Sequence, residues 1–114
     1  MRKLPGMTIS ALVIQTDGGH EVVDIEPTLE AFKEAVGGWL EPVSSGEDWL
    51  AYVDEEGRIK QLPINTRATA LARHLGWPGD FLVGPVVFVG QERRGEDGAV
   101  EVSVPPRIVE AVVH

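Results

Sequence analysis

The sequence predicts an α+β domain: a mostly antiparallel sheet with two or three short helices packed on it. Short β-branched, apolar stretches alternate with turn signals, as is typical of hairpins. Two further segments carry apolar residues at helical spacing and end at glycine. With 114 residues, 43% hydrophobic and 25% charged, the chain suits one core. We therefore expect a single domain over residues 8–114, preceded by an arm at residues 1–7.

The chain is expected to begin with a hairpin. Residues 8–14 and 21–25 are apolar and rich in β-formers. Between them, Asp17, Gly18 and Gly19 tolerate the positive φ that a tight turn requires.

A helix is expected next. Thr28 is the predicted N-cap, and a glycine pair at the far end favours the left-handed conformation that closes a helix. Leu29, Phe32 and Val36 fall at i, i+3 and i+7, so we expect them to share one face.

Strands are predicted at residues 39–43 and 49–53, joined by a turn at 44–48. Alternation in the second strand places Trp49 on a face that suits burial. Residues 58–62 are predicted to form a short strand or an extended piece before a proline.

A second helix should begin at Asn65 or Thr66, either of which can cap it. Gly76 and Pro78 end it. Its apolar stripe consists of Ala68, Leu71, Ala72 and Leu75.

The last part of the chain returns to the sheet. Residues 80–84 and 85–90 are predicted to form one or two strands, followed by a charged loop at 91–99. A final strand at 100–104 and a short helix at 107–113 complete the domain.

Composition removes several classes of function. The chain has no cysteine, which excludes disulfides and thiol chemistry. Its longest apolar stretch, residues 81–90, is too short for a membrane helix, and we expect a cytoplasmic protein. The net charge of -8 argues against direct binding of nucleic acid. The three histidines lack metal-ligand spacing, and no nucleophile elbow or phosphate loop is present. We therefore expect no metal and no cofactor, and favour a binding protein over an enzyme.

The start of the second helix is the main candidate site. Asn65, Thr66, Arg67 and Thr69 could bind a phosphate or carboxylate, because a helix start presents free N–H groups and arginine offers a bidentate fork. The simpler interpretation is ordinary capping and packing, and the local sequence alone favours it.

Aromatic side chains offer a second binding element. Trp39 and Trp77 lie at element boundaries, where a half-exposed ring could stack on a nucleotide base. Packing remains the commoner role of tryptophan, and we assign it to Trp49.

Four blocks give the chain a family resemblance. They are "ALVIQTDGGHEVVDI", "AVGGWLEPV", "YVDEEGRIKQLPINTRATAL" and "GDFLVGPVVFVG", within residues 8–90. The chain resembles the DUF3846 domain family, found in bacteriophages, plasmids and actinobacterial genomes. The resemblance implies a small stand-alone protein of phage or mobile-element origin, with no assigned activity. It also makes "NTRAT" look like a family signature, which strengthens the binding interpretation of that segment.

Three functions follow from these observations. The first is non-enzymatic binding or sequestration of a small anionic, nucleotide-derived ligand such as a host immune signal, in the host cytoplasm if the protein is phage-encoded; a homodimer could complete a weak site. The alternative is an acidic interaction module that inhibits a host protein, at the extreme as a nucleic-acid mimic. Its acids are Glu47-Asp48, Asp54-Glu55-Glu56 and Glu96-Asp97. A small nucleotide hydrolase ranks last because no catalytic set stands out.

Overall fold

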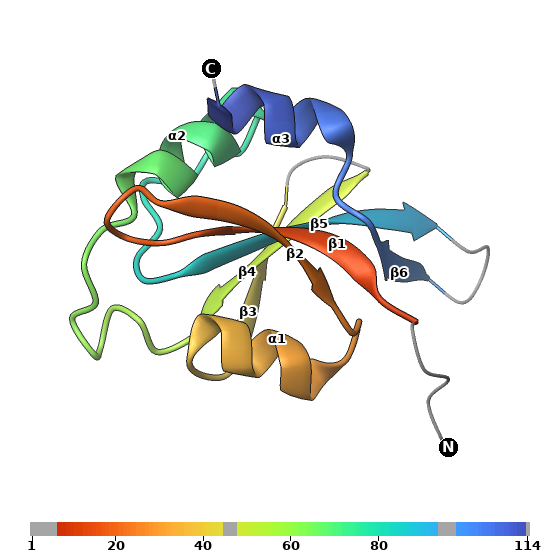
Figure 1. Ribbon diagram of the computed structural model, residues 1–114. Helices are drawn as coiled ribbons and strands as arrows, with labels where there is room; N and C mark the ends of the chain where they lie inside the picture. Colours follow the sequence, from red (N-terminus) through yellow and green to blue (C-terminus); the bar gives the residue numbers. More distant parts are fainter. Residues whose placement is uncertain (1–6, 45–47, 94–97, 114) are drawn as a thin grey trace.

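In the part of the chain that the structure describes, an antiparallel sheet of six strands has three helices packed on it (Figure 1). The computed structural model describes residues 7–44, 48–93 and 98–113. All strand pairs in these ranges are antiparallel. The predicted α+β class is therefore confirmed.

The elements follow one another as hairpins separated by helices. In chain order they are β1 (Ile9–Ile14), β2 (His20–Ile25), α1 (Leu29–Val36), β3 (Leu40–Val43), β4 (Trp49–Asp54), α2 (Thr66–His74), β5 (Val86–Arg93), β6 (Ala99–Val102) and α3 (Pro106–Val113).

The sheet order is β2-β1-β5-β4-β3, so the first and fifth strands are neighbours at its centre. β5 is long enough to serve two partners on one side. Its first half pairs with β1, with Leu12 opposite Phe88, and its second half pairs with β6, with Gln91 opposite Glu101. The end of the β6 segment is tied to β1 by a hydrogen bond from the Val104 N–H to the Ser10 carbonyl (2.8 Å).

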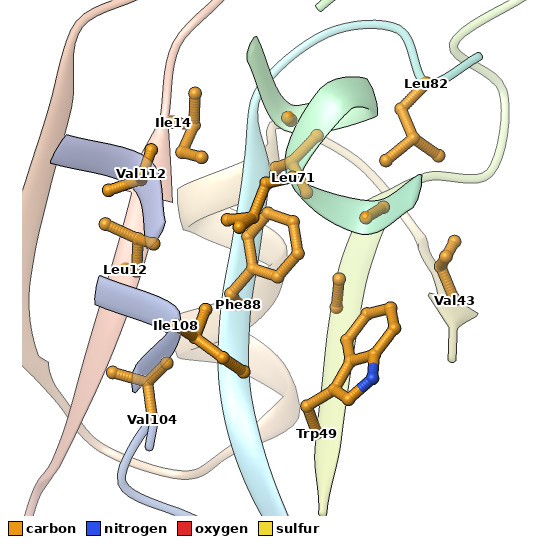
Figure 2. Packing of buried hydrophobic residues seen from close by; sticks show 14 of the residues in the cluster. Leu12, Ile14, Val43, Trp49, Leu71, Leu82, Phe88, Val104, Ile108 and Val112 are labelled. Atoms are coloured by element: carbon orange, nitrogen blue, oxygen red, sulfur yellow. The ribbon is translucent and has the colours of Figure 1, made fainter. Parts of the chain in front are cut away.

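The helices cover the two faces of the sheet unequally. α2 and α3 lie side by side on one face, whereas α1 lies on the other (Figure 1). Between the sheet and the helix pair lies the larger core, in which the rings of Trp49 and Phe88 have centroids 5.9 Å apart (Figure 2). The predicted core position of Trp49 and the buried face of the second helix are thus confirmed.

A smaller core lies under α1. Phe32 and Val36 are buried there against sheet residues, and Phe32 contacts the Tyr52 ring at a centroid distance of 4.9 Å. Leu29 was predicted to share this face, but it is 51% exposed. The buried stripe of α1 is therefore one turn shorter than predicted.

Residues 58–61 form turns, so the strand or extended piece predicted at residues 58–62 is wrong for all but Leu62. The reason is the carboxylate of Asp54. It accepts hydrogen bonds from the Glu56 N–H (2.9 Å) and from the Lys60 ammonium (2.7 Å), and these bonds curl the segment back on itself. Gln61 completes the reversal with a φ of 59°.

The strand predicted at residues 80–84 is also absent; only an isolated bridge between Ile64 and Val83 forms there. β5, in contrast, is longer than predicted and continues to Arg93, into the segment predicted to be a loop. The hydrophobic pattern ended earlier, but β6 supplies the pairing that keeps this polar stretch extended.

Some predictions fall outside the described residues. They concern residues 1–6 of the expected arm, residues 45–47 of the expected turn and residues 94–97 of the expected loop. Within the described ranges, no helix has the length and apolar character needed to cross a membrane.

Candidate functional site

Asn65 joins three parts of the molecule from a fully buried position. Its side-chain carbonyl caps α2 by accepting from the Ala68 N–H (3.0 Å). Its amide donates to the carbonyls of Ile14 and Gly84, each at 2.9 Å. With 0% exposure, its side chain cannot touch a ligand in this conformation. The expected cap is found, and the buried hydrogen bonds give Asn65 a structural role.

Thr69 has a similar internal role. Its hydroxyl donates to the Asn65 carbonyl (2.8 Å) and accepts from the Leu82 N–H (2.9 Å). It is buried, so its hydroxyl is committed to holding the loop before β5 against α2. Two of the four residues proposed from the helix start therefore stabilise the fold.

Asp54, in the segment that precedes α2, has a structural role as well. Burial alone would raise the pKa of Asp54, but hydrogen bonds from Lys60 and from the Glu56 N–H outweigh it, and the pKa lies below its ordinary value. Gly38 lies so close that a Cβ there would come within 2.6 Å of the Asp54 carboxylate. These contacts give Asp54 and Lys60 a structural role that needs no ligand.

Thr66 and Arg67 are exposed, and both line a surface pocket. The pocket has a volume of about 630 Å³ and is a shallow groove open to solvent. Its walls come from the β1–β2 turn, the outer face of α2 and the last turn of α3. The lining residues are Thr16, Asp17, Gly18, Thr66, Arg67, Ala70, Leu71, His74, Ala111 and Val112.

The Arg67 guanidinium is held at this pocket by one of its nitrogens. Nη1 contacts Nδ1 of His20 at 3.2 Å and donates to the Val112 carbonyl at 3.2 Å. Within the described ranges, no protein acceptor is found for its other N–H groups. Arg67 is thus positioned by β2 and α3 while most of its fork can still bind an anion.

The two tryptophans lie elsewhere. Trp39 is 58% exposed and carries the Lys33 ammonium 3.5 Å from its ring centroid, so one ring face is already covered. Trp77 is half-buried against the larger core, and its ring packs directly on Gly79. Neither residue lines the pocket beside Arg67. The structure does not bring the expected stacking rings together with the expected anion-binding residues.

Two of the acidic clusters are partly used within the fold. The Asp48 carboxylate accepts two hydrogen bonds from Arg107, which lower its pKa. The buried Asp54 carboxylate forms an ion pair with the exposed Lys60 ammonium (2.7 Å). Glu47, Glu96 and Asp97 lie outside the described residues.

Sequence reasoning missed most of the pocket wall. Ala70 and His74 lie four and eight positions after Thr66, so helical spacing alone would have placed them on the same face. The β1–β2 turn and the end of α3 could not have been found in this way, because only the tertiary fold brings them to α2. Among the described residues, no group of three or more histidine or acidic residues could hold a metal ion.

Comparisons with known proteins place the chain in one family. A model of a domain of unknown function, DUF3846, matches residues 7–112. No curated protein and no solved structure matches the chain. The family match spans every helix and strand described above except the last residue of α3. The chain belongs to the DUF3846 family.

Proposed function

We propose that this protein binds a small anionic ligand in the groove between the β1–β2 turn, α2 and α3, without transforming it. The observation that best supports this proposal concerns Arg67 at the groove wall. Its guanidinium is held by His20 and by the Val112 carbonyl. Its remaining N–H groups have no protein acceptor in the described ranges. A pre-positioned arginine loses less side-chain freedom on binding than a mobile one, which favours affinity.

Other groups in the groove suit an anion of more than one charged oxygen. Thr66 contributes an exposed hydroxyl next to Arg67, and His74 lies further along the same helix face. Asp17 opposes them across the groove and would repel an anion that extends toward the turn. We therefore expect the charged end of the ligand to lie against α2.

A nucleotide remains the ligand class we favour, but its base cannot stack on Trp39 or Trp77 in this groove. Apolar contact would come instead from Ala70, Leu71 and Ala111. Sequestration of a nucleotide-derived signal in the cytoplasm, in the host cell if the gene is phage-borne, would require only this kind of binding.

The test is a thermal-shift and calorimetric screen of the purified protein. The probes are nucleoside phosphates, cyclic dinucleotides and ADP-ribose, with inorganic phosphate as the probe without a base. We expect at least one nucleotide to raise the melting temperature, since a ligand that binds only the folded state stabilises it. Arg67→Ala should abolish the shift, and Arg67→Lys should weaken it because lysine lacks the fork.

Arg93→Ala is the matched control, because it removes an exposed arginine from β5 far from the groove wall. It should leave the shift unchanged. The proposal fails if no probe binds, or if the Arg67→Ala protein binds as tightly as the wild type. If a probe is converted to a product during incubation, the protein is a hydrolase and the proposal of binding without turnover is wrong.

The acidic interaction module is less well supported. Asp48 and Asp54 each have a cationic partner within the chain, so they are not available as a free acidic surface.

A further inference from the structure

β2 lies at the edge of the sheet. Within the described part of the chain, β1 is its sheet neighbour and no strand follows on the outer side. Its residues His20, Glu21, Val22 and Asp24 are all exposed. An edge strand presents unpaired backbone groups, and these can pair with a strand of another chain.

The register of the β1–β2 hairpin shows which backbone groups point outward. The Gln15 N–H donates to the Gly19 carbonyl (2.8 Å), so this pair is hydrogen-bonded. Antiparallel pairs alternate between bonded and non-bonded, and the next pair, Ile14 with His20, is therefore non-bonded. By the same alternation, His20, Val22 and Asp24 direct their N–H and C=O groups away from β1.

These three residues also share one face of the sheet, the face covered by α2 and α3. Val22 stands opposite Leu12, which belongs to the larger core, yet Val22 is 47% exposed. Along this strand, Val22 is preceded by His20 and followed by Asp24 on the same face. The pattern is self-complementary when the strand meets a reversed copy of itself.

We propose that two copies of this chain pair through β2, antiparallel, about a two-fold axis at Val22. This register places Val22 opposite its counterpart and His20 opposite Asp24 of the other copy, twice by symmetry. On the opposite face, Glu21 meets Val23. The two sheets become one continuous sheet, and all three outward-facing residues of each strand find backbone partners.

Neighbouring symmetric registers are less favourable. Moving the axis to Glu21 sets two carboxylates directly opposite each other, which is destabilising. Moving it to Val23 leaves only two outward-facing residues of each strand, Val22 and Asp24, in bonded pairs. The charges on β2 therefore select one register and oppose unspecific edge pairing.

The contact between His20 and Arg67 prepares the histidine for this role. Arginine only donates hydrogen bonds, so in a neutral imidazole Nδ1 of His20 would accept from Arg67 and the ring proton would lie on Nε2. That N–H is the donor available to Asp24 of the second copy. One imidazole would thus connect the groove wall to the dimer interface.

Cysteine cross-linking tests the register, because the chain has no cysteine of its own. Val22→Cys should form a disulfide-linked dimer readily, since bonded antiparallel partners have Cα atoms about 5.5 Å apart. Asp24→Cys is the matched control on the same face. Its two cysteines would lie roughly 13 Å apart and should not cross-link. A mixture of His20→Cys and Asp24→Cys proteins should cross-link, although neither does so alone.

Sedimentation analysis over a wide concentration range tests the dimer itself. Val22→Lys places two ammonium groups on the axis and should raise the dimer dissociation constant roughly tenfold or more. Ile59→Lys makes the same chemical change at an 82% exposed position in the β4–α2 loop and should not affect assembly. A wild-type protein that stays monomeric throughout, or a dimer insensitive to Val22→Lys, overturns the proposal. Equal cross-linking of Val22→Cys and Asp24→Cys overturns the register.

Discussion

The side-chain amide of Asn65 donates a hydrogen bond to the carbonyl of Ile14, a residue 51 positions earlier in the chain. The same amide also bonds to Gly84, and the opposite oxygen of the side chain caps α2. One buried polar group therefore fixes the end of β1, the loop before β5 and the start of α2 relative to one another. A polar group buried in this way stabilises only if all its partners are present.

Asn65→Ala should lower the free energy of unfolding by about 3 kcal/mol, because two buried carbonyls and one helix N–H lose their partner. Denaturant unfolding followed by circular dichroism measures this. Thr66→Ala, an exposed change in the same turn, should stay within about 0.5 kcal/mol. Similar losses for the two variants would contradict the structural role of Asn65.

Asp54 should make stability depend on acid. Its folded pKa lies below the ordinary value of 3.8, so the unfolded chain binds a proton first as the pH falls. Its contribution is complete above pH 3.8 and is lost as the pH falls through the folded pKa. Asp54→Asn should therefore flatten the fall of stability in this acid range and lower stability at neutral pH.

Unfolding curves at a series of acidic pH values provide the measurement. Asp80→Asn removes an exposed carboxylate and serves as the control. An acid profile of Asp54→Asn that matches that of Asp80→Asn would refute this expectation.

Tyr52 should ionise only in strongly alkaline solution. Burial, followed by its hydrogen bond to the Glu101 carboxylate (2.5 Å), raises its pKa above the ordinary value of 10.0. The unfolded chain loses this proton first, so the contribution of Tyr52 to stability is complete below pH 10.0 and is lost as the pH rises through the folded pKa. Tyr52 is the only tyrosine, so tyrosinate absorbance reports on it alone. Ionisation near pH 10.0 while the circular dichroism remains native would contradict the contact.

Gly90→Ala should destabilise the protein by about 1–3 kcal/mol through steric overlap. A Cβ at this position would lie 2.4 Å from the Ser103 carbonyl oxygen, and backbone cannot move aside as a flexible side chain can. Gly19→Ala is the control, because its nearest atom is the Asp17 side chain at 3.1 Å on the surface. Thermal unfolding of the two variants should separate them clearly; equal melting temperatures would argue against the close approach.

The sequence predicted regular elements well where the hydrophobic period was clear, as in β4, or where period and capping agreed, as in α2. It failed at residues 58–62, because the extended conformation expected before Pro63 was overridden by the Asp54 carboxylate, whose hydrogen bonds hold the segment in turns. It failed at 80–84 because Asn65 and Thr69 hold that segment through hydrogen bonds, and among the described residues its β pairing is limited to the Ile64–Val83 bridge.

The sequence did not show which residues at the start of α2 face solvent and which face the core. Thr66 and Arg67 lie at the groove, whereas Asn65 and Thr69 are internal, and a capping pattern cannot distinguish these two outcomes. Side chains that bind a ligand and side chains that bind distant backbone are of the same chemical types. Which backbone comes near depends on the pairing of strands far apart in the sequence, and that was not readable from local spacing.

The strand order has a consequence for synthesis of the protein. β1 is made first but finds its central neighbour, β5, only after most of the chain has been translated. Until then the β1–β2 and β3–β4 hairpins have no common strand to join them, and neither core can close. Closing such long-range pairings is slow compared with forming local hairpins. We therefore expect the emerging chain to acquire protease resistance in one late step, when β5 pairs with β1 on one side and with β4 on the other.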